Sequence, residues 1–213
     1  MKRNYWFTAD SHWSHSNIIK YCKRRFALSD DELDFLDNGE NFRVSSESTR
    51  IHDDYLIDQI NKYVGKEDVL WHLGDFCFAP KHCYYEVCRD FRNRIKCNHV
   101  NFIFGNHDQR NIYNLFESSH DLYHLYIGNQ LLVLCHYALA VWNKSHHGSY
   151  MLYGHSHSTA EDWLNQMMPG RRSFDVGVDN AYKLLGEYRP FSYDEIVDIM
   201  STKKGHSIDH HGE

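Results

Sequence analysis

The chain has 213 residues, of which 42% are hydrophobic and 15% are aromatic. This length and composition suit one folded domain with a core and exclude an intrinsically disordered chain. No stretch approaches the roughly 18–20 apolar residues that span a bilayer. The apolar patch near the N-terminus is too short for the apolar region of a signal peptide. We therefore expect a single domain over 1–204, no membrane segment, and a disordered tail over 205–213.

Charge and cysteine usage narrow the class further. The formal net charge is −6, the opposite of the basic character that binding to long nucleic acids requires. The six cysteines show no CxxC spacing, which fits reduced thiols and a cytoplasmic protein. Histidine is unusually frequent, with 17 residues, and it is the commonest metal ligand in proteins.

The first part of the chain is expected to alternate strand and helix around a polar stretch. Ser14 or Ser16 is the expected cap of the first helix, and Gly65 ends the second. In chain order, the expected elements are a strand at about 4–9, a loop at 10–16, a helix at about 16–23, a polar surface excursion at 27–48 and a helix at about 49–64.

The rest of the chain predicts a strand, helix, strand unit, which favours parallel pairing, and then a hairpin at Gly128-Asn129. Ser192 and Glu195 have the spacing of a capping box, which opens the last helix. The expected elements are strands at about 68–73 and 100–104 around a helix at about 81–94, a short helix at about 109–116, strands at about 122–127, 130–135, 150–153 and 173–178, and a helix at about 193–201.

Five of the short apolar runs lead into a residue that can bind a hard metal ion. Buried strands of this kind place the groups at their ends along the edge of a sheet, where open α/β sheets have their sites. The five residues are Asp10, Asp75, Asn106, His136 and His155.

Neighbouring residues strengthen the case for metal binding. His12 lies two residues after Asp10, and His157 lies two residues after His155, which are spacings that suit chelation. Asp75 follows a glycine at a predicted strand end, where a buried carboxylate needs a strong partner. Each motif alone is as easily a turn or a polar strand end, and it is their joint occurrence that favours a metal site.

The candidate ligands are seven nitrogen and oxygen donors, which is too many for one ion unless some are spectators. Two ions bridged by Asp75 would use all of them. The mixture of imidazole, carboxylate and amide without thiolate suits Mn, Fe, Zn or Ni and does not choose among them. The seven are Asp10, His12, Asp75, Asn106, His136, His155 and His157.

The order of these motifs resembles the calcineurin-like metallophosphoesterases. The matching sequence elements are D-x-H at Asp10/His12, G-D at Gly74/Asp75, G-N-H-D from Gly105 to Asp108, a lone His136, and G-H-x-H from Gly154 to His157. The resemblance implies an α/β fold of four layers, with two mixed β-sheets face to face and helices on their outer sides. It is strongest to small metallophosphoesterases of bacteria and phages.

The same resemblance implies how the donors divide. One ion would take Asp10, His12, Asp75 and His157, and the other would take Asp75, Asn106, His136 and His155. A hydroxide that bridges the two ions would attack phosphorus. His107 is the candidate catalytic residue, since an imidazole with a pKa near neutrality can donate a proton to the leaving oxygen.

One departure from the family pattern concerns the group that orients His107. In the protein phosphatases of this superfamily, an aspartate three residues beyond the bridging aspartate does so, and here that position is Phe78. The arginine with which those phosphatases clamp phosphate is also missing. Phosphoprotein substrates are therefore disfavoured, and phosphodiesters or other small phosphoesters are favoured.

Several further residues near these motifs are candidates for substrate contacts or for the core. His15, Trp142, Asn143, His146 and His147 could face the substrate, with the loop of His146 and His147 hanging over the metals. Arg24 or Arg25 could also face the substrate, but a solvated helix end is the preferred expectation for both. Trp71 and His72 are expected in the core, and no function is assigned to His52, His82, His99, His120 or His124.

The prediction is a dinuclear-metal phosphohydrolase, most readily a phosphodiesterase acting on a nucleotide-like or other small phosphoester. A phosphomonoesterase is the alternative among enzymes, and a metal-binding interaction scaffold without catalysis is the alternative from another class. A nuclease acting on a polymer is disfavoured by the acidic charge. The sequence determines neither the substrate nor the oligomeric state.

Overall fold

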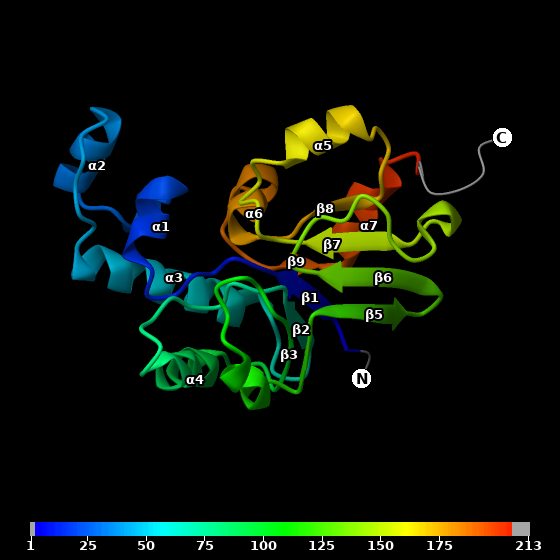
Figure 1. Ribbon diagram of the computed structural model, residues 1–213, viewed down its shortest axis with the longest axis horizontal. Coiled ribbons are helices and arrows are strands. Elements are labelled where there is room, and N and C mark those ends of the chain that lie inside the picture. The colour runs from blue at the N-terminus through cyan, green and yellow to red at the C-terminus, as the bar shows by residue number, and fades with distance from the viewer. Residues whose placement is uncertain (1–2, 206–213) are drawn as a thin grey trace.

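Two mixed sheets form the centre of the protein, whose computed structural model describes residues 3–205 (Figure 1). In the first sheet the strand order is β4-β3-β2-β1-β9, with β1 to β4 parallel and β9 antiparallel to β1. The strands are β1 (Tyr5–Thr8), β2 (Val69–His72), β3 (His99–Ile103), β4 (Ser118–His120) and β9 (Phe191–Ser192).

The second sheet has the order β5-β6-β7-β8. Strands β5 and β6 form the antiparallel hairpin predicted at Gly128-Asn129, and β6, β7 and β8 are parallel. The strands are β5 (Leu122–Ile127), β6 (Gln130–Cys135), β7 (Tyr150–Tyr153) and β8 (Ser173–Asp175).

Seven α-helices and three 3₁₀ turns lie within the described residues. The α-helices are α1 (Ser16–Tyr21), α2 (Asp30–Asp37), α3 (Ser46–Tyr63), α4 (Tyr84–Arg94), α5 (Glu161–Met167), α6 (Val178–Leu185) and α7 (Tyr193–Ser201). The 3₁₀ turns are η1 (Arg25–Ala27), η2 (Arg110–Leu115) and η3 (Ser145–His147).

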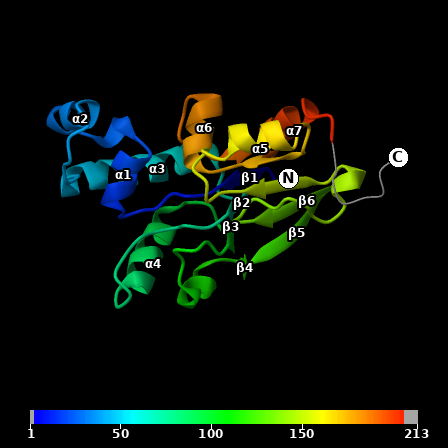
Figure 2. The same ribbon diagram turned by 45° about the horizontal axis from the view of Figure 1, so that its top comes forward.

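Three hydrophobic clusters show the layers, because alternate residues of a strand face opposite sides of its sheet. In β6, Leu132 and Leu134 pack against the first sheet, whereas Leu131 and Val133 share a cluster with Leu164 of α5. A further cluster joins α3 and α4 to the outer face of the first sheet. The predicted sandwich of two mixed sheets flanked by helices is therefore confirmed (Figure 2).

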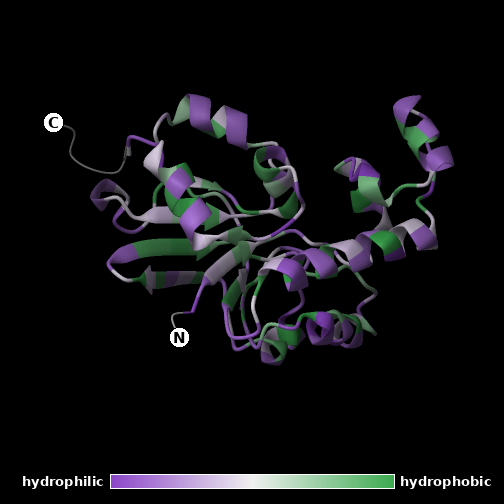
Figure 3. Cartoon of the chain, turned by 180° about the vertical axis from the view of Figure 1, so that it is seen from behind, coloured by the Kyte–Doolittle hydropathy of each residue, from purple (hydrophilic) through white to green (hydrophobic). Residues whose placement is uncertain are grey.

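Apolar residues are concentrated in the strands, while the surrounding helices alternate hydrophilic and hydrophobic positions (Figure 3). Helices α1 and α2 lie to one side of the sheets and have a small core of their own, which includes Ile19 and Leu28. None of the helices between residues 3 and 205 is both long and apolar enough to cross a membrane.

The capping box at Ser192 and Glu195 is confirmed at the start of α7. The predicted cap of α1 is wrong, since His15 occupies the N-cap position and its side chain makes no capping bond. The stretch 27–48 was expected to be an excursion and contains α2, while α5 and α6 were not predicted. The tail predicted to be disordered lies, from residue 206 onward, outside the described residues.

Candidate metal centre

The parallel strands bring the candidate ligands to one edge of the sandwich. Asp10, Asp75 and Asn106 follow β1, β2 and β3 of the first sheet, while His136 and His155 follow β6 and β7 of the second. The sequence argument predicted convergence at the edge of one sheet. The ligands in fact come from both sheets, because the two sheets are stacked with these strand ends on the same side.

The backbone is strained at this edge. Five of the seven candidate ligands have a positive φ: Asp10 (59°), His12 (50°), Asp75 (55°), His155 (69°) and His157 (47°). Residues with a side chain rarely adopt this region, and each such residue costs roughly 1–3 kcal/mol. Strain of this kind clusters at functional sites, where the surrounding structure holds side chains in one arrangement.

The first group of donors is Asp10, His12 and His157, whose ligand atoms all lie within 4.8 Å of one another. His12 is buried, and neither of its ring nitrogens has a hydrogen-bond partner. Burial lowers the pKa of His12 to about 2, so its imidazole is neutral. A buried, neutral imidazole with free nitrogens fits a divalent cation as its partner.

Asp10 is also fully buried, and burial raises its pKa to about 7. Its carboxylate accepts the backbone N–H of His155 at 3.0 and 2.9 Å. A side chain at Gly154 would collide with Asp10, because its Cβ would lie 2.7 Å from Asp10 Oδ2. The glycine therefore lets the loop after β7 close over the Asp10 carboxylate.

The second group is Asp75, His136 and His155, again within 4.8 Å of one another. Asn106 joins it, since its Oδ1 lies 3.1 Å from His136 Nε2 and 2.9 Å from His155 Nδ1. His136 Nδ1 donates to the carbonyl of Leu73 at 2.7 Å. This bond directs Nε2 of His136 toward the group.

Asp75 lies between the two groups. Its Oδ2 is 3.4 Å from His12 Nε2 and 3.5 Å from His136 Nε2, while its Oδ1 accepts the backbone N–H of His107 at 3.0 Å. A side chain at Gly105 would overlap Asp75 Oδ1. The structure therefore brings all seven sequence-predicted donors together, with one carboxylate common to both groups.

His107 lies next to the first group, with its ring centroid 5.4 Å from that of His12. The ring of Phe78 is 5.8 Å from His107 and stacks on His15 at 4.1 Å. Within residues 3–205 no carboxylate hydrogen-bonds to the His107 ring. The neighbouring Asp108 is occupied elsewhere, because its carboxylate accepts backbone N–H groups at the ends of β2 and β3.

Three expectations about flanking residues are wrong. Arg24 is not a solvated helix end, because it is fully buried. Trp142 does not face a substrate, since it is 8% exposed in the outer core of the second sheet. His146 and His147 do not hang over the metals, because η3 lies at the opposite end of the strands, where Gln130 donates to the carbonyl of Gly148.

Two buried carboxylates near the centre were missed by sequence reasoning. Asp175 is the last residue of β8 and accepts hydrogen bonds from the hydroxyl of Ser156 and from the N–H of Ser158, so it holds the loop that contains His155 and His157. Asp179 of α6 bonds to His157. Neither residue follows an apolar run as the candidate ligands do, because β8 has the sequence Ser-Phe-Asp and Asp179 lies within α6, so local pattern did not point to them.

Comparison with known proteins assigns the family. The model of the calcineurin-like phosphoesterase superfamily domain matches residues 51–170, more than half of the chain. The chain belongs to this superfamily. As a calcineurin-like phosphoesterase it is a hydrolase of phosphoric esters, and the family uses divalent metals, in keeping with the donor groups described above.

Individual relatives are distant. An uncharacterized protein of Methanocaldococcus jannaschii is 25% identical over 203 residues, which is 95% of this chain and 94% of that protein. A protein of unknown function from Aquifex aeolicus has a similar structure, with a TM-score of 0.62 and 17% identity over 93% of this chain and all of that one. An archaeal phosphodiesterase matches with a TM-score of 0.37 and 13% identity over 86% of this chain and 88% of its own.

Proposed function

We propose that this calcineurin-like phosphoesterase is a dinuclear-metal phosphodiesterase that acts on a small, nucleotide-like phosphoester. The observation that carries the proposal is the position of Asp75, whose Oδ2 lies within 3.5 Å of a histidine from each donor group. A carboxylate shared by two donor groups is the arrangement that two-metal phosphoesterases need. The number of ions is part of the proposal, and manganese is the probe with which we would begin.

The donor groups suggest how the ions would be held. When bound, the two ions would supply an activated water and neutralise charge on the phosphoryl oxygens. One ion would be held by Asp10, His12, Asp75 and His157, and the other by Asp75, Asn106, His136 and His155.

His107 is the group we assign to proton donation. Its backbone N–H is anchored on Asp75 Oδ1 at 3.0 Å, which fixes the residue beside the donor groups. From there its imidazole would give a proton to the leaving oxygen as the ester bond breaks. Since no carboxylate of the described residues bonds to the ring, its contacts there are with the rings of His12 and Phe78.

A phosphodiester fits this chain better than a phosphomonoester. A monoester carries a second negative charge, which the related phosphatases meet with an arginine. Arg24 cannot serve that purpose here, because it is fully buried and ion-paired with Asp179. Arg25 pairs with Asp37 on the surface.

Two exposed rings favour a substrate with a planar group. Phe78 is 46% exposed beside His107, and Tyr137 is 46% exposed with its ring centroid 4.8 Å from that of His155. Aromatic side chains at such positions can stack with a nucleobase. A small substrate is consistent with the net charge of −6, which opposes binding to a nucleic-acid polymer.

The test is a hydrolysis panel on protein loaded with Mn²⁺, Ni²⁺ or Zn²⁺, using mono- and bis-nitrophenyl phosphate and cyclic nucleotides. We expect the diesters to be cleaved with a higher kcat/KM than the monoester, and Asp75→Asn to lose at least about 10³-fold in rate. Faster cleavage of the monoester would favour the phosphomonoesterase. If no substrate is cleaved faster than by Asp75→Asn, the proposed phosphodiesterase activity fails.

A further inference from the structure

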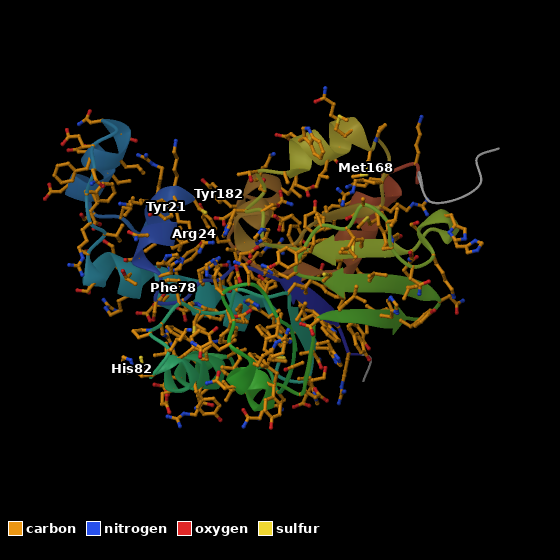
Figure 4. All side chains as sticks on the ribbon, in the orientation of Figure 1. Tyr21, Arg24, Phe78, His82, Met168 and Tyr182 are labelled. Carbon is orange, nitrogen blue, oxygen red and sulfur yellow. The ribbon has the colours of Figure 1, made fainter. Side chains whose placement is uncertain are left out.

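Arg24 is an arginine buried at the junction of three parts of the chain. It lies between α1 and η1, close to α3 and α6 (Figure 4). Its side chain is 0% exposed. A buried guanidinium is costly unless all of its donors are satisfied and its charge is balanced. The hydrogen-bond partners of Arg24 therefore indicate which segments it holds in place.

All five N–H donors of the Arg24 guanidinium have an acceptor. Nε and Nη2 donate to the two carboxylate oxygens of Asp179 at 2.9 and 2.8 Å. Nη2 also donates to the carbonyl of Asp10 at 2.8 Å, and Nη1 donates to the carbonyl of Ser11 at 3.1 Å. The fifth contact is from Nη1 to Nε2 of His52 at 2.8 Å.

His52 can accept this bond because its other nitrogen is engaged. Its Nδ1 lies 2.8 Å from Asp53 Oδ1, and Asp53 in turn accepts the backbone N–H of Ser14 at 3.1 and 3.0 Å. Burial lowers the pKa of His52 well below 6.5, so its ring is neutral, with the proton on Nδ1. The loop that contains Asp10 and His12 is thus held from α3 as well as by Arg24.

Asp179 connects the guanidinium to a candidate ligand. Its Oδ2 accepts Nδ1–H of His157 at 2.7 Å while also accepting from Arg24. With Nδ1 occupied, Nε2 is the nitrogen of His157 that remains for a metal ion. The ring of His157 is stacked on that of His12, with centroids 5.1 Å apart.

We infer that the Arg24–Asp179 ion pair positions one of the two metal sites, by fixing His157 with Nδ1 protonated and the Asp10-Ser11 backbone in its strained conformation. The inference rests on the proposed role of Asp10, His12 and His157 as ligands. A carboxylate that holds the second nitrogen of a ligating histidine raises its basicity and sets its orientation. The second donor group has a different support, the carbonyl of Leu73 on His136.

Lysine cannot replace arginine in this position. Its ammonium has three donors and no planar fork, so it cannot hold both oxygens of Asp179 and two backbone carbonyls together. Arg25 and Asp37 provide a matched control in the same segment. They also form a two-point ion pair, but both side chains are more than half exposed, at 51% and 57%.

The test is a calorimetric titration of the full-length, chelator-stripped protein with MnCl₂. For Asp179→Asn and Arg24→Lys we expect one of the two Mn²⁺ sites to weaken by about 10- to 100-fold, with the other changed by less than about threefold. Asp37→Asn should bind both ions as the wild type does. A folded Asp179→Asn with both affinities unchanged would overturn the inference.

A measurement on the wild type covers the case in which neither variant folds. In the Zn²⁺-loaded protein, long-range ¹⁵N NMR should find the His157 proton on Nδ1, and a proton on Nε2 would overturn the inference. Failure of the proposed function is a different result. In that case the wild type would bind Mn²⁺ no better than Asp75→Asn does.

Discussion

At the scale of single residues, His107 is the group that we propose as the general acid, and no carboxylate between residues 3 and 205 hydrogen-bonds to its ring. A general acid matters most when the leaving group is a poor one, because a good leaving group departs without a proton. We therefore expect His107→Ala to lower kcat by about 10²- to 10⁴-fold on an alkyl diester such as glycerophosphocholine, and by much less on bis-nitrophenyl phosphate. Release of alcohol and of nitrophenol measures the two rates. Equal losses on both substrates would contradict the assignment.

His72 gives a prediction about pH and stability. It is fully buried between aromatic rings, Ser11 bonds to its Nε2, and burial lowers its pKa from 6.5 to about 3. The unfolded chain therefore binds a proton below pH 6.5 that the folded chain does not, so stability falls as the pH drops. Between pH 7.5 and pH 5, the titration of His72 should lower the free energy of unfolding by about 2 kcal/mol.

Urea unfolding of the chelated protein at both pH values checks this. Between these pH values, the free energy of unfolding of His72→Gln should fall by about 2 kcal/mol less than that of the wild type. His82→Gln, at an exposed histidine, should lose as much as the wild type. If His72→Gln and the wild type show the same difference, His72 is not the source of the acid sensitivity.

The contrast between the candidate ligands and Arg24 shows which residue roles can be predicted from local sequence. Each group of candidate donors follows an apolar run, so local pattern was enough to pick out the seven residues that the structure brings together. The partner of Arg24 is Asp179, which is 155 residues away in sequence, and no local pattern relates them. The neighbouring basic residues Lys23 and Arg25 made a solvated helix end the natural expectation, and tertiary structure reversed it.

At the scale of elements, Asp108 joins the ends of two strands. Its carboxylate accepts the backbone N–H groups of Asp75, Phe76 and Gly105 at 2.7 to 3.0 Å and the hydroxyl of Tyr84 at 3.0 Å. Asp108→Ala would leave these buried donors without an acceptor. We expect a loss of about 2–4 kcal/mol in the free energy of unfolding.

The loss at Asp108 should also weaken metal binding, because the loops that carry Asp75 and Asn106 would no longer be held together. Urea unfolding and Mn²⁺ titration measure the two effects. Asp121→Ala is the control, since Asp121 makes an exposed ion pair with Arg110. An Asp108→Ala protein as stable as this control would show that the loops are held by other contacts.

Elements with a strong periodic pattern were predictable, but a cap was not sufficient by itself. Helix α7 was predicted from its capping box, whereas α2, which starts with a capping box at Ser29 and Glu32, was missed. The β2-α4-β3 unit, the β5-β6 hairpin and the capped start of α7 all agree with the sequence analysis. Helices α5 and α6 have seven and eight residues and no side-chain cap, so their sequences carry little signal. Leu164 of α5 packs in the outer core of the second sheet and Ala181 of α6 packs in the core between the sheets, so tertiary contacts stabilise these helices.

At the scale of the whole molecule, the four-layer architecture could be predicted through the family resemblance and not through strand patterns alone. Those patterns indicated that ligands gather at strand ends, but they contained no information on how many sheets there are. The strands separate into two sheets because of how they pack: alternate residues of β6 and β7 contact the core between the sheets and the outer layer of helices. The consequence for function is that each donor group takes side chains from both sheets.

A metal ion held by both sheets should stabilise the entire fold. Asp10 and His12 come from the first sheet and His157 from the second, while Asp75 of the first sheet meets His136 of the second. An ion that binds the folded chain and not the unfolded one adds about 2.7 kcal/mol per site at a concentration 100 times its Kd. For a chain of this size that corresponds to a rise in Tm of roughly 5–10 °C per site.

Thermal unfolding with Mn²⁺ and with a chelator measures this rise. Asp75→Asn should lose most of it, because the shared carboxylate contributes to both groups, whereas Asp121→Asn should keep it. Asp179→Asn should lose about a quarter to two-fifths of it, since one site that is 10- to 100-fold weaker would contribute about 1.4 to 0.4 kcal/mol instead of 2.7. A rise in Tm of Asp75→Asn equal to that of the wild type would mean that Mn²⁺ binds elsewhere, and that the two sheets are held together by their apolar faces without help from the metal.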